Sequence, residues 1–489
     1  MTDIPNDAPP GWSTLLSGRN GVYALVLAGG VVLHSVNIYI ATTVMPSAVQ
    51  DIGGLDFYAW TTTLFVLASI LAAAVTAPFL RATGPRAAYA AAALIFAGGS
   101  LICALAPSMP VMLGGRFIQG FGGGLLYALA YAVTRIVFPE ALWGRVISVI
   151  SAMFGVATLI GPAIGGLFAE MGAWRLAFGS LIPVAGLFIL LALTALPGRD
   201  GAREGGGRLP LFQLLLLSGA VLSVSAGSLS PLLAWNLAGL GAAVALVVLI
   251  AVVDGRSQAR LLPRRSFSLK TPLGVLYLTI ALLMAGMQAE IFVPYLLQTL
   301  HAQSPLWAGY LAALMAFGWT FATLASSRWQ SGSGTRLLFA GPLLMLGGLI
   351  LMSVFLPIET AGGAGVLAGV CLGLFLVGFG IGLVWPALVT RVFQNAPDDE
   401  RDLTSGAMTT VQLFAIAMGA AGAGMIANVA GIATPGGVEG AASAAFWLSA
   451  LFAAGPILVL LLTPQLLRLT AARRGAASLG HAGNPARPG

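Results

Sequence analysis

Long uncharged stretches, separated by short charged segments, follow one another along almost the whole chain. An α-helix needs about 20 predominantly apolar residues to cross a membrane, and most of these stretches reach that length. Because lipid offers the backbone no hydrogen-bond partner, we expect the segments to be helices. The pattern predicts fourteen spans with approximate bounds of 20–46, 58–80, 88–106, 110–134, 146–168, 177–197, 210–227, 231–252, 272–297, 306–327, 337–356, 363–388, 405–430 and 441–464.

The basic residues fall mainly on one side of these predicted spans. If the N-terminus is cytoplasmic, 21 of the 23 lysines and arginines lie on the cytoplasmic side. The two exceptions are Arg116, which lies inside a span, and Arg175, which lies on the opposite side. Cytoplasmic loops of membrane proteins carry an excess of basic residues. The distribution therefore predicts an even number of spans with both termini in the cytoplasm.

Two polar linkers divide the spans into two six-helix bundles and a two-helix insert. The predicted units are a cytoplasmic N-terminal tail at 1–19, an N-terminal six-helix bundle at 20–198, a linker and two-helix insert at 199–253, a basic cytoplasmic linker at 254–271, a C-terminal six-helix bundle at 272–465, and a disordered cytoplasmic tail at 466–489. Internal repeats are common in secondary transporters. A shift of 253 residues lays Asn37 over Glu290 in the first spans of the two bundles.

The composition excludes several classes of protein. Hydrophobic residues make up 58% of the chain and charged residues only 8%, whereas a soluble domain carries about 25% charged residues. A water-soluble enzyme, a disordered chain and a nucleic-acid-binding protein are therefore not expected, despite the net charge of +7. The only cysteines, Cys103 and Cys371, lie in apolar segments and cannot form a disulfide framework or a metal cluster. We expect neither a cofactor nor a metal.

Three short motifs carry a resemblance to a known family. Residues 116–122 read Arg-Phe-Ile-Gln-Gly-Phe-Gly, residues 161–166 read Gly-Pro-Ala-Ile-Gly-Gly, and residues 174–178 read Trp-Arg-Leu-Ala-Phe. With these motifs the chain resembles a major facilitator superfamily transporter of the fourteen-span drug:proton antiporter type. The resemblance implies the major facilitator fold of two six-helix bundles plus the insert. It also implies alternating access, multidrug efflux and a multi-pass location in the bacterial inner membrane.

The sequence departs from the family pattern at two places. In the loop after the second span, only Gly84 and Arg86 match the family's gating motif, and Arg81 stands where the motif has an acid. The acid that the family carries in its first span aligns with Asn37. Both the usual gate and the usual coupling site are therefore altered in this chain.

Glu290 is the only carboxylate inside any predicted span. An ionisable group in the bilayer core costs about 2.5–3.5 kcal/mol on insertion scales, so such groups usually have a function. One interpretation is that Glu290 carries a proton and is exposed to each side of the membrane in turn. The alternative is a static buried ion pair, for example with Arg116. His34, which titrates near neutral pH, is a second candidate for proton coupling, or a neutral side chain bonded to a neighbouring helix.

Other polar and aromatic residues could form a substrate cavity. Asn37 lies one turn from His34, and the helical face of Arg116 continues through polar and aromatic positions. The candidates for this cavity are Asn37, Arg116, Gln119, Tyr127, Met287 and Trp385. Each has a structural alternative, since Arg116 could lock the bundle through backbone carbonyls and the Met and Trp side chains could simply pack. The same holds for the motif residues Gly161, Pro162, Gly165 and Gly166, because small residues favour close helix packing in membranes.

Together these features favour a proton-coupled secondary transporter that exports small amphipathic compounds. Its expected partners are a small-molecule substrate, protons and the lipid bilayer, without nucleic acid, and a monomer is expected. A uniporter or importer on the same fold is the alternative, because the acid of the first span is missing. A membrane-embedded enzyme is least favoured, since the sequence has neither a His-Glu-x-x-His nor a Gly-x-Ser-x-Gly motif.

Overall fold

Every regular element in the described part of the chain is a helix. The structure is a computed structural model, which describes residues 11–198, 209–230, 232–257, 259–326, 334–360 and 362–482. The helices, with 3-10 helices marked η, are α1 Trp12–Leu16, α2 Gly18–Ile52, η1 Leu55–Phe57, α3 Trp60–Ala104, α4 Met109–Val137, α5 Glu140–Glu170, α6 Trp174–Gly179, α7 Leu181–Ala195, α8 Leu211–Gly227, α9 Leu233–Arg256, α10 Pro272–Gly286, η2 Met287–Phe292, α11 Val293–His301, α12 Pro305–Ser326, α13 Gly334–Phe355, α14 Ala364–Gln394, η3 Asp398–Glu400, α15 Arg401–Val429, α16 Gly437–Phe452 and α17 Ala454–Ala482.

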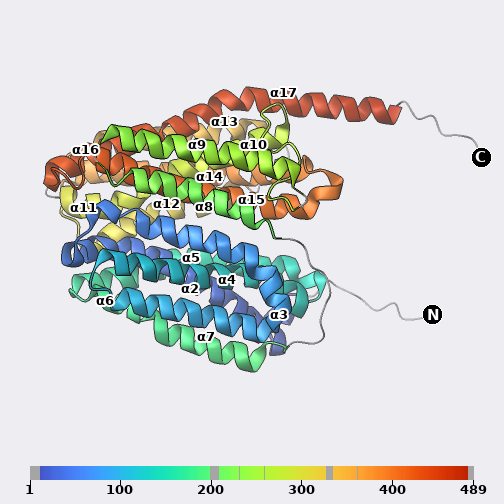
Figure 1. The fold of residues 1–489 in the computed structure, drawn as a ribbon, viewed down its shortest axis with the longest axis horizontal. Coiled ribbons are helices and arrows are strands. Elements are labelled where there is room, and N and C mark those ends of the chain that lie inside the picture. The colour runs from blue at the N-terminus through green and yellow to red at the C-terminus, as the bar shows by residue number, and fades with distance from the viewer. Residues whose placement is uncertain are drawn as a thin grey trace, which may run out of the picture.

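The helices form two bodies that lie side by side (Figure 1). Helices α2 to α7 make one body, which we call the N-terminal half, and helices α10 to α17 make the other, the C-terminal half. The pair α8 and α9 lies on the C-terminal half, where Ala220 and Val224 of α8 pack with Ala243 of α9 and Ala421 of α15. The two-helix insert is therefore part of the C-terminal body rather than a bridge between the halves.

Helix α3 is a hairpin of two antiparallel legs. At 45 residues it would be about 68 Å long if straight, more than twice the thickness of a bilayer core. Gly84 breaks it with a φ of 78°, a left-handed conformation that only glycine adopts without cost. The contacts of α4 show that the two legs run in opposite directions. Residue numbers rise together along α4 and the first leg, where Gly120 contacts Phe65 and Gly124 contacts Ser69. On the second leg the numbers fall as those of α4 rise, since Gly115 contacts Cys103 and Gly122 contacts Phe96.

Twelve segments of the described chain are long and apolar enough to cross a membrane. One of them, Leu55–Ala104, contains both legs of α3, and the shorter apolar helix Leu211–Gly227 is not among the twelve. The fourteen predicted segments match these helices when the two legs are counted separately and α8 is added. The chain is thus an all-helical, multi-pass membrane protein, while the number of fourteen crossings and the cytoplasmic termini stay predictions.

The predicted disordered tail at 466–489 is wrong for its first part. Helix α17 continues without interruption to Ala482, and the remaining residues lie outside the described ones. Residues 471–477 consist of alanine, arginine and one glycine, and alanine and arginine are among the strongest helix formers. Local propensity therefore extends the last helix beyond the end of its apolar segment. The predicted linker at 199–208 and most of the N-terminal tail also lie outside the described residues.

The close helix contacts of the two halves repeat at constant separations. In α4 and α14, four pairs of glycines lie 258 residues apart: Gly115 and Gly373, Gly120 and Gly378, Gly122 and Gly380, and Gly124 and Gly382. Their contacts on the preceding spans are also equivalent. Gly120 and Gly124 meet Phe65 and Ser69, whereas Gly378 and Gly382 meet Met315 and Trp319, in both cases 250 residues further along the chain. The two halves therefore share one packing scheme.

Candidate functional site

Arg116 is tied into the N-terminal half by three contacts. Only 2% of its surface is exposed. Its Nε donates a hydrogen bond to the carbonyl of Thr61 over 3.2 Å, and its Nη1 donates to Oε1 of Gln119 over 2.6 Å. Its guanidinium carbon lies 4.3 Å from the centre of the Phe65 ring. The ion pairs of the described residues do not include one between Arg116 and Glu290.

Gln119 extends this polar cluster to the second leg of α3. Its Nε2 donates a hydrogen bond to Ser100 Oγ over 2.8 Å, and the side chain is fully buried. Ser100 Oγ in turn donates to the carbonyl of Phe96. Arg116 and Gln119 therefore connect α4 with both legs of α3. Neither side chain is exposed enough to contact a substrate in this conformation, and the arrangement agrees with the structural alternative of a lock.

His34 stands in a row of aromatic rings inside the N-terminal half. Its ring stacks on Phe65 at a centroid distance of 5.3 Å and on Tyr127 at 5.5 Å. Tyr127 then contacts Tyr131 at 5.3 Å and Phe154 at 5.9 Å. The row continues the helical face predicted from Arg116 and joins α2, α3, α4 and α5. His34 Nδ1 is buried without a hydrogen-bond partner.

Asn37 is fully buried in α2, and neither atom of its amide has a hydrogen-bond partner. Leaving a buried donor or acceptor unpaired costs about 1–3 kcal/mol. Native structures contain only a few such groups, and these groups often have a function. With Nδ1 of His34 and Oγ of Ser35, α2 thus carries unpaired polar atoms on three neighbouring residues at mid-helix.

Glu290 lies where the first span of the C-terminal half loses its α-helical geometry. It belongs to the 3-10 helix η2, Met287–Phe292, which joins α10 to α11. A 3-10 stretch within a helix often marks a hinge. The carboxyl is partly buried and lies within electrostatic range of the Tyr39 hydroxyl of α2. The only predicted intramembrane acid therefore lies near α2 of the N-terminal half.

Trp385 and Met287 lie in the C-terminal half, and both are partly buried. The Trp385 ring contacts that of Trp319 at a centroid distance of 5.4 Å. Trp385 lies 258 residues after Tyr127, which is the separation of the repeated glycines in α4 and α14. Tyr127 and Trp385 are therefore equivalent positions of the two halves.

The Gly-Pro-Ala-Ile-Gly-Gly motif lies where α5 meets α2 and α12. A Cβ atom on Gly161 would lie 2.3 Å from Cβ of Tyr39, and one on Gly166 would lie 2.4 Å from Cα of Leu306. Gly165 packs against Ile40 in the same way, and Pro162 faces Gly309 of α12. Close packing thus requires these small residues, as the structural alternative holds, and it places the motif at the boundary between the halves.

A family model described as Major Facilitator Superfamily matches residues 27–420. The chain belongs to this superfamily. It is therefore a transporter rather than an enzyme, as the sequence predicts.

Relatives of this Major Facilitator protein include curated proteins and solved structures. It is 38% identical over 428 residues to a "Probable multidrug-efflux transporter" of Mycobacterium tuberculosis, which covers 86% of this chain and 90% of the relative. It is 24% identical over 392 residues to the multidrug transporter protein MdtP of Bacillus subtilis, covering 78% and 71% of the two chains. A POT family transporter in complex with 5-aminolevulinic acid has a TM-score of 0.67 at 14% identity, covering 94% of this chain and 98% of that one. A D-xylose–proton symporter has a TM-score of 0.60 at 16% identity, with coverages of 91% and 97%. The two solved structures show the fold alone.

The altered loop of this Major Facilitator transporter is anchored within the N-terminal half. Gly84 makes the turn of α3. Arg86 then donates from Nε to the carbonyl of Leu196 over 2.9 Å and from its backbone N–H to the carbonyl of Pro197 over 3.2 Å. The two residues that match the family's gating motif therefore fasten the α3 turn to the end of α7. Whether they also gate transport stays a prediction.

The structure adds three aromatic residues that the sequence analysis did not select. Tyr39 lies within electrostatic range of Glu290, Phe65 contacts both Arg116 and His34, and Tyr58 stacks on Phe292 of the C-terminal half at 4.8 Å. The 253-residue shift aligns the segment around Asn37 with the segment around Glu290, and Tyr39 lies in the first of these segments, two residues after Asn37. This repeat is a sequence signal from which Tyr39 could have been selected. Phe65 and Tyr58 carry no such signal, because their importance comes from partners far away in the sequence.

Proposed function

We propose that this protein is a proton-coupled exporter of small amphipathic compounds that works by alternating access in the bacterial inner membrane. Membership of the superfamily supports transport, and the similarity to multidrug transporters of Mycobacterium tuberculosis and Bacillus subtilis supports multidrug efflux. The observation that carries proton coupling is the position of Glu290 in a 3-10 break, within electrostatic range of Tyr39 of the other half. A monomer contains all of these residues and suffices for the mechanism.

In this proposal Glu290 binds and releases the coupling proton. The ionised form must be solvated or neutralised, whereas the protonated form can be buried against the N-terminal half. Tyr39 packs on Gly161 of the Gly-Pro-Ala-Ile-Gly-Gly motif and lies within electrostatic range of Glu290. A change of charge on Glu290 would therefore be felt where the Gly-Pro-Ala-Ile-Gly-Gly motif joins α2. Proton binding would thereby bias the packing of the two halves.

The substrate would bind between the two halves, with aromatic residues on both sides. Tyr127 and His34 belong to the aromatic row of the N-terminal half, and Trp385 with Trp319 forms the equivalent cluster of the C-terminal half. Met287 lies three residues from Glu290. Aromatic and methionine side chains make adaptable apolar pockets. Such a lining favours planar, amphipathic compounds over strongly polar ones. The unpaired amide of Asn37 is fully buried in this conformation and would provide a polar contact once the cavity opens.

The test is to replace Glu290 with glutamine, which resembles the protonated carboxyl. Purified Glu290→Gln in proteoliposomes should lose transport of a fluorescent dye such as ethidium driven by a pH gradient. It should keep exchange of labelled for unlabelled ethidium, because exchange requires no net proton movement. The matched control is Glu439→Gln, an exposed acid in the first turn of α16. If Glu290→Gln is driven by the pH gradient as well as the wild type, this assignment is wrong.

A uniporter or importer is the second candidate, because an amide at residue 37 replaces the acid usual in the first span. The fold does not decide between the directions, since the solved structures that share it include a proton symporter. An ionophore that collapses the proton gradient separates the two in cells. A rise in the cellular accumulation of ethidium indicates proton-driven export, whereas an unchanged or lower accumulation favours the alternative.

A further inference from the structure

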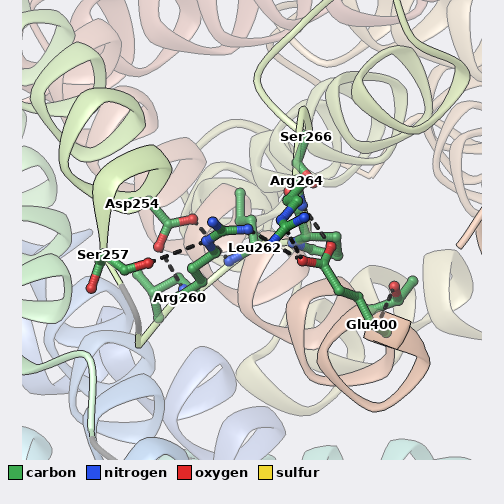
Figure 2. A network of polar contacts seen from close by, with 10 residues as sticks. Asp254, Ser257, Arg260, Leu262, Arg264, Ser266 and Glu400 are labelled. Carbon is green, nitrogen blue, oxygen red and sulfur yellow. Dashed lines mark hydrogen bonds and ion pairs between the residues drawn. The ribbon is translucent and has the colours of Figure 1, made fainter. Parts of the chain in front are cut away.

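A cavity of about 540 Å³ lies where the linker after α9 meets the start of α15. Its lining residues are Arg256, Ser257, Arg260, Arg264, Glu400 and Leu403. Figure 2 shows Arg260 and Arg264 converging on Glu400 across this space. None of these residues takes part in the proposed proton or substrate sites. On the predicted topology, the cavity lies at the cytoplasmic surface of the membrane.

The walls of the cavity are fixed by hydrogen bonds. Oε1 of Glu400 accepts a bond from Nη1 of Arg260 over 3.2 Å, and Oε2 accepts from the backbone N–H of Arg264 over 2.8 Å. Nε of Arg260 also donates to the carbonyl of Ser257 over 3.2 Å. The linker is attached to α8 as well, because Gln213 donates to the carbonyl of Ala259. The site thus joins the two-helix insert to the C-terminal half.

The cavity carries an excess of positive charge. Three guanidinium groups line it, and Glu400 is the only carboxylate among its lining residues. The nearby carboxylate of Asp254 is directed elsewhere, since it accepts bonds from the backbone N–H groups of Leu261 over 2.6 Å and Leu262 over 3.2 Å. The side chain of Arg264 is 67% exposed, although it lies 3.5 Å from Glu400. Arg256 forms no ion pair in the described part of the chain. Planar guanidinium groups of this kind recognise phosphate oxygens.

An apolar stripe leads from the cavity along the outer face of α9. Val244, Val248 and Val252 are exposed by 57%, 58% and 42% of their surfaces. They repeat at a spacing of four residues, and the next position in the series is Arg256. Residues four apart lie on one helical face, so the exposed valines end directly at the basic cavity. One molecule could therefore place its apolar chain along the valines and its anionic group at Arg256.

We propose that this cavity binds the phosphate headgroup of an anionic phospholipid, whose acyl chain lies along the valine stripe of α9. Basic pockets between membrane helices on the cytoplasmic side suit such headgroups. The lipid would hold the two-helix insert against the linker and α15. A soluble phosphate would match the charge of the cavity but not the adjoining apolar stripe.

The test compares lipid retention by the full-length protein and by the variant Arg256→Gln/Arg264→Gln. Both proteins are purified with phosphatidylglycerol or phosphatidylcholine, and bound lipid is counted by native mass spectrometry. The wild type should retain phosphatidylglycerol several-fold better than phosphatidylcholine, and the variant should lose this preference. The matched control, Arg336→Gln, changes an exposed arginine at the start of α13 and should behave as the wild type. Equal preference in the double variant and the wild type would overturn the proposal.

Two further measurements on the wild type do not depend on the folding of a variant. Raising the ionic strength should release phosphatidylglycerol, because the contacts are electrostatic; retention unaffected by salt would contradict a headgroup site. Inorganic phosphate should compete poorly, because it lacks an acyl chain. If phosphate raises the melting temperature of the protein as much as phosphatidylglycerol does, the cavity takes a soluble anion and the lipid proposal is wrong.

Discussion

The N-terminal and C-terminal halves share one packing scheme but place their polar groups differently. In α4, Arg116 and Gln119 form a buried polar cluster, whereas the equivalent positions of α14, 258 residues further along, are Leu374 and Val377. The C-terminal half instead carries a carboxyl on the 3-10 helix of its first span. The N-terminal half therefore adds a buried hydrogen-bonded cluster to the shared packing, while the C-terminal half has apolar packing in α14 and an ionisable group at a break. This comparison suggests a rigid half and a responsive half.

The shared scheme can be broken most severely at the repeated glycines. A Cβ atom on Gly378 would lie 1.7 Å from the carbonyl oxygen of Met315, and one on Gly120 would lie 2.3 Å from that of Phe65. Because backbone atoms cannot move aside, we expect Gly378→Ala and Gly120→Ala each to cost about 3 kcal/mol, at the upper end for overpacking. The measurement is the melting temperature of the purified variants, followed by size-exclusion chromatography.

Matched controls exist in α4 itself and in α13, which packs against α14. A Cβ atom on Gly114 or Gly347 would meet nothing within 4 Å. Gly114→Ala and Gly347→Ala should therefore leave the melting temperature unchanged or slightly higher, because alanine favours helix over glycine by about 1 kcal/mol. Equal melting temperatures for the control and test variants would show that the glycine contacts do not support the two halves.

The polar lock of the N-terminal half can be replaced by the residues of the other half. Arg116→Leu alone leaves Oε1 of Gln119 buried without this charged donor, which should cost about 1–3 kcal/mol of stability. Adding Gln119→Val removes that acceptor, while Ser100 keeps its bond to the carbonyl of Phe96. The double variant should therefore be more stable than the single one and should still transport ethidium, as measured by melting temperature and dye efflux. If it folds but no longer transports, Arg116 has a role beyond the lock.

Much of the fold follows from the sequence because membrane insertion depends on properties of single segments. The apolar stretch 88–106, for example, ends two residues after the second leg of α3, and the stretch 363–388 begins one residue before α14. The close helix packing at Gly161 and Gly166 also follows from the sequence, since small residues in a motif allow a neighbouring helix to approach closely. Local signals of hydrophobicity, charge and residue size were sufficient for these features.

The site could be predicted only in part, because its geometry depends on pairs of distant residues. The sequence selects Glu290 by its charge, but the 3-10 geometry around it and its approach to Tyr39 depend on tertiary packing. It offers Arg116 either a carboxylate or backbone carbonyls as partners, and only the structure gives Thr61 and Gln119. The composition of a segment does not determine which of these partners a side chain contacts, because each helix packs against several neighbouring helices.

The two aromatic clusters sharpen the comparison between the halves. If Tyr127 and Trp385 contact the substrate as equivalent residues, Tyr127→Ala and Trp385→Ala should each reduce ethidium efflux by about tenfold, which corresponds to the upper part of the energy of an aromatic pair. Tyr127→Phe keeps the ring and should retain efflux. The measurement is the substrate dependence of efflux in proteoliposomes. A loss in only one of the two alanine variants would mean that the cavity is one-sided.

The smallest effect is expected at His34, where the two interpretations of the sequence differ most. His34 lies between the rings of Phe65 and Tyr127, and no carboxylate of the described residues forms an ion pair with it. His34→Phe keeps the stack, so we expect the proton-driven efflux of ethidium to change by less than about threefold, which is less than 1 kcal/mol. Proton uptake during efflux, followed with a pH-sensitive dye inside proteoliposomes, is the deciding measurement. If His34→Phe abolishes proton uptake while ethidium exchange persists, His34 relays the proton and coupling in this protein involves both halves.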